Sequence, residues 1–198
     1  DLQADHPTVL ALFEPQPGFM SPNYEYPHIL WALEALAWSE GLFSRVATVM
    51  ARLAVIAPKT QISNSPAGSL FSFFRLWYPQ CGASLEGRLR ALDLIRSRVP
   101  DVAWDLMLRL IPRGYDAASV LGGPGARAVL WRDWPSQAPS IDGKEHMAAV
   151  EAISDRILDD AGLSPARWSE LILEFDQLFP GQMNRALDAL RRLEALLK

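Results

Sequence analysis

A chain of 198 residues is long enough for one or two domains with a sizeable core, and 49% hydrophobic with 21% charged residues exclude global disorder. The formal net charge of −4 gives no electrostatic attraction to phosphate backbones or anionic membranes, which argues against nucleic-acid and membrane partners. The single cysteine, Cys81, excludes an internal disulfide and a thiolate metal cluster, and it suits a reducing, cytoplasmic location.

Two apolar segments near the N-terminus predict neighbouring helices, because their apolar residues recur with a period close to 3.6. The segment 27–38 is apolar almost all round, so we expect it to occupy a central position. The segment 42–56 has Arg45 and Arg52 off its stripe, and it is too short and too charged to span a bilayer. The short link between the two segments predicts antiparallel packing. The stripe of the second segment consists of Leu42, Val46, Val49, Leu53 and Ile56.

Capping residues and prolines mark the next three helices. The Ser-Pro pair at 65–66 predicts the start of a helix that runs to about Trp77. Ser84 predicts the N-cap of a second helix, and Pro100 opens a third that is short and apolar. The inward stripe predicted for the second helix is Leu85, Leu89, Leu92 and Ile95.

The helix that follows Ser65 carries more aromatic residues than one stripe can hold. Both of its faces must therefore be covered, either by two helical layers or by a neighbouring repeat. A dimer formed through this aromatic segment is a further possibility. The residues concerned are Phe71, Phe73, Phe74, Trp77 and Tyr78.

The segment 113–141 differs from the rest, since it is rich in Gly, Pro, Ala and Ser. We expect a long ordered loop with one aromatic anchor, Trp131, Arg132, Asp133 and Trp134. The structural interpretation is a clamp that holds the loop on the helices, and the residues favour it. The functional alternative is an exposed hot spot for a protein partner. The glycines at 122–125 lack the Lys and Ser or Thr that a phosphate-binding P-loop requires.

Three helices are expected after this loop. Asp142 and Glu145 stand in capping-box relation at the start of the first helix, and Gly162 ends it. The Ser-Pro pair at 164–165 opens the second helix and Pro180 opens the third. The chain thus divides into a helical-repeat segment (1–112), the loop (113–141) and a three-helix continuation (142–198).

The sequence shows no assembled catalytic or metal site. His6, His28 and His146 lack a second ligand at helical spacing, so each is expected to be a surface residue or a satisfied core residue. Cys81 has no recognisable base beside it and is interpreted as structural. Asp155 and Asp159 lie four residues apart and could hold a divalent ion, although a solvated helix face is the simpler interpretation. We therefore predict no catalytic residue, no metal and no cofactor.

These patterns predict an all-α fold of stacked antiparallel helices. Modest helix lengths and short turns are typical of an α-solenoid like the HEAT, armadillo and TPR arrays, here interrupted by one long ordered loop. A compact bundle would show similar patterns, and the internal similarity along the chain is faint.

Seven short motifs occur in an order that suggests a family. They are LEALAWS at 33–39, SRVA at 44–47, SNSP at 63–66, FRLWYP at 74–79, SLEGRL at 84–89, DVAW at 101–104 and WRDW at 131–134. Together they resemble the helical-repeat region of very large bacterial proteins similar to STAND-type NTPases, some of them implicated in defence. The resemblance covers residues 26–134. It implies a helical sensor or scaffold whose nucleotide site and effector lie in other domains.

The expected function is therefore a non-catalytic scaffold or sensor segment of a larger intracellular bacterial protein. It would bind protein partners or neighbouring domains, with no catalytic or nucleotide-binding residue carried over, because the chain has no Walker motif. The alternative is a small all-α ligand- or metal-binding domain or enzyme that uses Asp155 and Asp159, or the loop around Trp131 and Trp134.

Overall fold

A computed structural model describes residues 7–15, 24–57, 64–112, 140–174 and 180–196. Within these ranges the chain forms α-helices and no strand, which confirms the all-helical prediction. The helices are α1 (Pro7–Ala11), α2 (Tyr26–Leu36), α3 (Glu40–Ile56), α4 (Pro66–Phe74), α5 (Leu85–Arg98), α6 (Pro100–Leu110), α8 (Gly143–Ala161), α9 (Pro165–Ile172) and α10 (Pro180–Leu196). None of these helices combines the length and apolar character that a membrane crossing requires.

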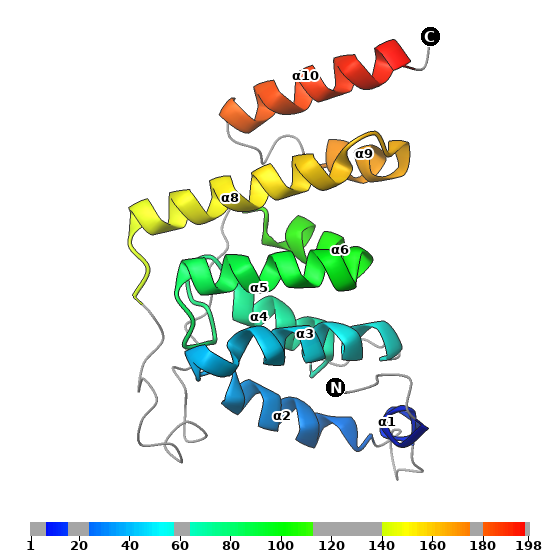
Figure 1. Ribbon diagram of the computed structural model, residues 1–198, viewed down its shortest axis with the longest axis vertical. Coiled ribbons are helices and arrows are strands. Elements are labelled where there is room, and N and C mark those ends of the chain that lie inside the picture. The colour runs from blue at the N-terminus through cyan, green and yellow to red at the C-terminus, as the bar shows by residue number, and fades with distance from the viewer. Residues whose placement is uncertain (1–6, 16–23, 58–63, 113–139, 175–179, 197–198) are drawn as a thin grey trace.

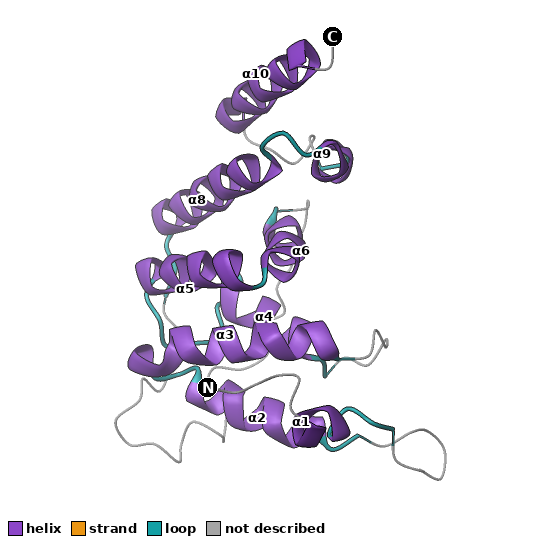
Figure 2. Ribbon diagram, turned by 45° about the vertical axis from the view of Figure 1, so that its right-hand side comes forward, coloured by secondary structure: helices purple, strands orange, loops and turns teal. Residues whose placement is uncertain are grey.

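The helices stack in layers along the long axis of the molecule (Figure 1). Two rows are visible when the molecule is turned: α3, α5, α8 and α10 form one, and α4, α6 and α9 form the other (Figure 2). The helices α1 and α2 lie at one end of the stack and α10 lies at the other. The main contacts join helices of the same layer or of adjoining layers, such as α3 with α4 and α5 with α8.

The predicted helix boundaries are largely confirmed, because the capping residues form the expected hydrogen bonds. The hydroxyls of Ser65, Ser84 and Ser164 accept from backbone N–H groups three residues later, at 3.1, 3.2 and 3.4 Å. The Asp142 carboxylate accepts from the Glu145 N–H at 2.7 Å. Each helix of the second row begins with a proline, as expected for a residue whose missing N–H costs nothing there.

The buried faces of α3 and α5 include the predicted stripes and are wider than them. In α3, Val46 and Leu53 are buried, and the other predicted residues are half-buried and packed against the core: Leu42, Val49 and Ile56. In α5, Leu92 and Ile95 are buried, and Leu85 and Leu89 are half-buried against the same core. Both helices are covered from several sides, because α3 contacts α2, α4 and α5, and α5 contacts α3, α6 and α8. The residues that are buried in addition include Phe43, Ala47 and Met50 of α3 and Gly87, Arg88 and Ala91 of α5.

Two further predictions differ from the structure. The helix α4 ends at Phe74 rather than near Trp77, and the chain continues as a connector to α5. The segment around α2 was expected to be central, but α2 lies in the end layer (Figure 1), and its Trp31 is 39% exposed. Apolar residues around a helix predict contacts on several sides, but they do not identify which contacts lie within the same chain.

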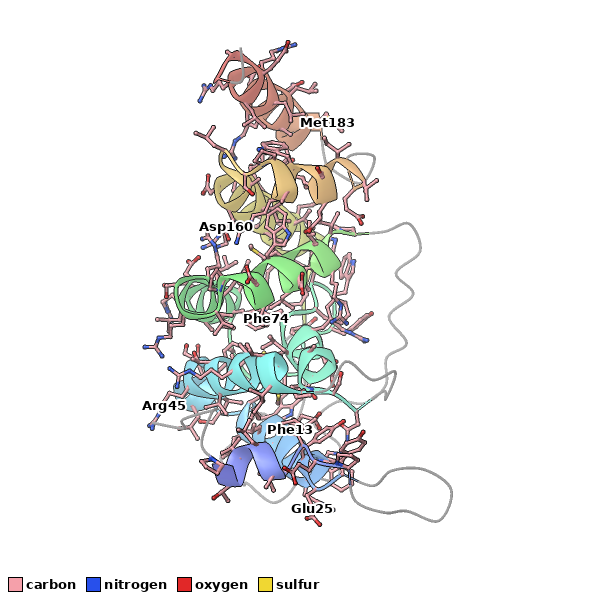
Figure 3. The ribbon with its side chains drawn as sticks, turned by 90° about the vertical axis from the view of Figure 1, so that its right-hand side faces the viewer. Phe13, Glu25, Arg45, Phe74, Asp160 and Met183 are labelled. Carbon is pink, nitrogen blue, oxygen red and sulfur yellow. The ribbon has the colours of Figure 1, made fainter. Side chains whose placement is uncertain are left out.

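Polar contacts also join the layers. Arg96 of α5 donates to Asp160 of α8, and Figure 3 shows Asp160 at the boundary between these two layers. The Trp104 indole N–H of α6 donates to the Glu170 carboxylate of α9, and the Arg167 guanidinium lies 5.1 Å from the Trp104 ring centroid. The order of the layers is therefore fixed by specific pairs as well as by apolar packing.

Candidate functional site

The connector between α4 and α5, residues 75–84, is held in place by several contacts. The Gln80 N–H donates to the Ser72 carbonyl at 2.8 Å, and the Gly82 N–H donates to the Ala37 carbonyl at 3.1 Å. A Cβ atom on Gly82 would lie 2.1 Å from the Trp38 carbonyl oxygen, so only glycine fits this approach. The connector therefore presents its other side chains from a fixed backbone.

Arg88 anchors the connector from α5. Its side chain is only 3% exposed. Nη1 donates to the Arg75 carbonyl at 3.1 Å, and Nη2 lies 3.3 Å from the Glu145 carboxylate at the start of α8. No acceptor within the described part of the chain lies within hydrogen-bonding distance of Nε. Burial lowers the pKa of Arg88, and the nearby Glu145 partly offsets this effect.

His146 and Trp77 form a stacked pair between α8 and the connector. Their ring centroids are 4.1 Å apart with an interplanar angle of 15°. Burial lowers the pKa of His146, and a hydrogen bond to the Leu76 backbone acts in the opposite direction. Nδ1 has no hydrogen-bond partner among the residues described. Since burial disfavours the charged form, the buried side of this stack favours the neutral imidazole.

Cys81 lies in the same connector but offers no chemistry. Its thiol is fully buried and donates to the Phe73 carbonyl over 3.4 Å. Burial raises the pKa of Cys81 to about 11, so the thiol stays protonated at neutral pH and is a poor nucleophile. This geometry agrees with the structural interpretation of Cys81.

The stacked pair supports a group of exposed apolar side chains, which we call the aromatic surface: Trp77, Tyr78 and Met147. Their exposed fractions are 38%, 40% and 48%. Tyr78 follows Trp77 in the connector, and Met147 follows His146 in α8, so each ring of the stacked pair has an exposed apolar neighbour along the chain. Large aromatic side chains on a fixed backbone lose little entropy on binding, and they are the residues enriched at protein–protein hot spots.

The structure describes only two of the predicted site residues, Asp155 and Asp159. Trp131, Arg132, Asp133 and Trp134 lie outside the described ranges, so both interpretations of that motif stay predictions. The Asp155 carboxylate forms an ion pair with Arg185 of α10.

Asp159 is exposed at the rim of a hollow of about 420 Å³ between α8 and α10, which Arg185 and Arg192 also line. Across the described ranges, no three His, Cys, Asp or Glu side chains are close enough to hold a metal ion. Because the Asp155 carboxylate is paired with the Arg185 guanidinium, the geometry of the described residues does not support the metal-binding alternative.

The contacts around Trp77 were not predictable from the sequence. His146 was expected to be a surface or satisfied core residue, yet its Nδ1 has no hydrogen-bond partner in the part of the chain that the structure describes, and its ring stacks on an indole 69 residues away along the chain. Arg88 was not placed on the buried stripe of α5. The available signal was its position one helical turn before Leu92 and two before Ile95, a register that a charged residue normally avoids.

The comparisons with known proteins identify no relative: no family model matches the chain, and no curated protein or solved structure is significantly similar to it.

Proposed function

We propose that this chain is an α-solenoid segment that serves as a non-catalytic scaffold or sensor within a larger protein, binding protein partners or neighbouring domains. The observation that carries the proposal is the two-row stack, in which the main contacts join the same or adjoining layers (Figure 2). In arrays of this kind, stability resides in interfaces between neighbours, and long lateral surfaces remain available to partners.

The aromatic surface supports a binding role. Trp77, Tyr78 and Met147 are exposed, while the connector beneath them is tied to α2, α4 and α5. Phe73 and Phe74 of α4 are buried in the core, whereas Trp77 and Tyr78 of the connector remain exposed. A protein partner with an apolar face is the occupant that these side chains suit best.

The place of this segment in a larger protein is proposed from sequence resemblance. The ordered motifs in residues 26–134 resemble the helical arrays of large bacterial STAND-like NTPases. The proposed role is that of the sensing or scaffolding part, with nucleotide hydrolysis and effector chemistry in other domains.

Native-state hydrogen exchange tests the solenoid proposal. Leu171 in α9 and Leu30 in α2 are both fully buried near opposite ends of the stack. Leu171→Ala should reduce amide protection in α8, α9 and α10 and leave α2 and α3 unchanged, because only neighbouring layers share interfaces. Leu30→Ala, the matched variant, should do the reverse. An equal loss of protection in every helix for either variant would mean one closed cooperative unit and would end the proposal.

Site-specific photo-crosslinking tests the binding role. A photoreactive phenylalanine analogue is placed at Trp77 or Tyr78 in the full-length parent protein and irradiated in its native cell. Leu94 of α5 is the control position, because it is 38% exposed on another part of the molecule. Crosslinks to one defined protein segment at Trp77 and Tyr78, and not at Leu94, are expected. Equal crosslinking at all three positions would refute the aromatic surface as the binding site.

A further inference from the structure

The hollow of about 420 Å³ between α8 and α10 is lined by one side of each helix. Figure 1 shows that the two helices run in the same direction, and they are in contact with each other. On α10 the lining residues recur at helical spacing, at positions 185, 188, 189 and 192. On α8 and in the turn after it, the lining residues are at positions 158, 159, 162 and 163. We call this space the α8–α10 hollow.

The hollow carries two charged side chains that have no partner. Asp159 of α8 and Arg192 of α10 are exposed, and neither side chain forms a hydrogen bond or an ion pair with another residue in the described ranges. The other charged residues of the lining are already paired: Arg185 with Asp155, and Asp188 with Arg191. One negative and one positive charge are therefore available to a ligand.

The ion pair between Arg185 and Asp155 sets the register of these two charges. Asp159 follows Asp155 by four residues and Arg192 follows Arg185 by seven, which correspond to rises of about 6 and 10 Å along the two helices. The unpaired charges are thus offset by about one helical turn along the hollow. A molecule that bridges them must carry a cationic and an anionic group only a few bonds apart.

Apolar side chains line the remainder of the hollow. Leu163, in the turn between α8 and α9, is 62% exposed although it is a large apolar residue. Its turn is held in place, because the Trp168 indole N–H donates to the Gly162 carbonyl at 2.9 Å. Leu158 and Ala189 add apolar surface from the two helices. An apolar group of a ligand that removes part of Leu163 from water gains free energy.

We propose that the α8–α10 hollow binds a free α-amino acid or a dipeptide with an apolar side chain. The ammonium group of the ligand binds the Asp159 carboxylate, its carboxylate binds the Arg192 guanidinium, and its side chain lies against Leu163. A guanidinium can donate two parallel hydrogen bonds to one carboxylate, and a carboxylate accepts from an ammonium group. The hollow shares no residue with the aromatic surface, so this inference does not depend on the proposed function.

Other classes of ligand match the hollow less well. An anion would leave Asp159 without a partner and bring its own charge near Asp188, and a metal ion would meet Arg185 and Arg192. A neutral apolar molecule would remove water from both unpaired charges without replacing their hydrogen bonds. In an extended peptide of several residues, the terminal charges lie too far apart to reach both side chains. A small zwitterion meets both charges and the apolar lining.

The size and exposure of the hollow set the expected affinity. Its volume lies within the range of roughly 300–1,000 Å³ that small-molecule sites have. Because Asp159 and Arg192 are exposed, water weakens both ion pairs with the ligand. We therefore expect reversible binding, with a dissociation constant on the order of 0.1–1 mM.

Two-dimensional NMR of the 198-residue chain, titrated with leucine and with leucyl-leucine, tests the proposal. At least one of the two should cause saturable shifts of the backbone amides at 158–163 and 185–192, and comparing them tells an amino-acid site from a dipeptide site. N-acetyl-leucine lacks the cation and leucinamide lacks the anion, so each should bind at least about fivefold more weakly than leucine. The absence of saturable shifts with either zwitterion up to about 10 mM, or equal binding of N-acetyl-leucine or leucinamide, overturns the proposal.

Charge-removing variants test whether the hollow is the site. Asp159→Asn and Arg192→Gln each remove one of the unpaired charges and should weaken binding by about fivefold or more. The matched controls are Glu151→Gln in α8 and Arg98→Gln in α5, which remove exposed charges outside the hollow and should leave the affinity unchanged. Circular dichroism checks that all four variants are folded. Equal affinities for the four variants would place the ligand elsewhere and overturn the proposal.

Discussion

Arg96 and Asp160 form a two-point ion pair across the interface of α5 and α8. The Asp160 carboxylate accepts from Arg96 Nε at 3.0 Å and from Nη2 at 2.6 Å, and both side chains are largely buried. Since these two residues are 64 positions apart, the pair fixes the register between two layers of the stack. Asp93 extends it, accepting from Arg96 at 2.8 Å and from Arg156 at 2.7 Å.

Asp160→Asn should lower the free energy of unfolding by about 1–2 kcal/mol, because it weakens a charge-assisted pair and leaves the Arg96 guanidinium without its main counter-charge. Urea denaturation measures the change. The double variant Asp160→Asn with Arg96→Met should be less destabilised than the sum of its single variants. Strict additivity would show that the two side chains do not interact in solution.

Asp93 should make stability depend on acid pH. The hydrogen bond from Arg156 is the largest cause that lowers the pKa of Asp93 below its ordinary value of 3.8, and Arg96 adds to it. The stabilisation is present above that ordinary value and is lost as the pH falls through the lower pKa of the folded state. Unfolding of the parent chain and of Asp93→Asn should therefore differ most near neutral pH and converge in strong acid. A constant difference across this range would be inconsistent with the network.

His146 should also make the protein less stable as the pH falls, but at a higher pH than Asp93 does. Burial lowers its pKa below the ordinary value of 6.5, so the unfolded chain binds a proton more readily than the folded chain. Stability is complete above about 6.5 and decreases as the pH falls toward the lower pKa of the folded state. His146→Phe keeps a ring against Trp77 and removes the titration. We expect the midpoint temperature of thermal unfolding to decrease less for this variant than for the parent chain between pH 7.5 and pH 5, values that bracket the ordinary histidine pKa of about 6.5. An equal decrease for the two chains would show that His146 does not cause the pH dependence.

Gly82 should tolerate no side chain. A Cβ atom there would meet the Trp38 carbonyl oxygen at 2.1 Å, and the backbone shift needed to relieve this would break the hydrogen bond to Ala37. Gly82→Ala should cost about 2–3 kcal/mol of unfolding free energy. Gly41→Ala is the control, because nothing lies within 4 Å of its added methyl group and alanine favours the helix. If Gly82→Ala left the free energy of unfolding unchanged, the connector would have to lie farther from Trp38 than the structure shows.

Trp131→Ala addresses the predicted clamp, which falls outside the described ranges. The clamp interpretation predicts a buried Trp131 indole, and on that interpretation its loss should lower the free energy of unfolding by about 3 kcal/mol. Denaturant unfolding is the measurement. Unchanged stability with lost partner binding would instead support the hot-spot interpretation of Trp131 to Trp134.

The helices and their starting points were readable from local sequence. Ser65, Ser84 and Asp142 cap helices where predicted, and Gly162 ends α8 with a φ of 44°, which glycine adopts without strain. These signals act over three or four residues, so one sequence is enough to detect them. The apolar period also established that the chain builds helices that bury one another.

The candidate site depended on contacts that local sequence does not encode. Trp77 meets His146, Arg88 meets Glu145, and neither pairing has a spacing rule that a sequence could reveal. The exposure of Trp31 was not predictable either. The sequence shows that α2 is apolar, but it does not show that α2 lies at the end of the stack.

The amino-acid sequence by itself therefore determined the helical class, most helix boundaries and the lack of a recognisable catalytic motif. Tertiary structure alone decided the order of the layers, how wide a face of α3 and of α5 is buried, and which of the described aromatic side chains reach the surface. The physical reason is range: capping and periodicity are properties of one helical turn, whereas burial and ion pairing depend on what other, distant segments place against that turn.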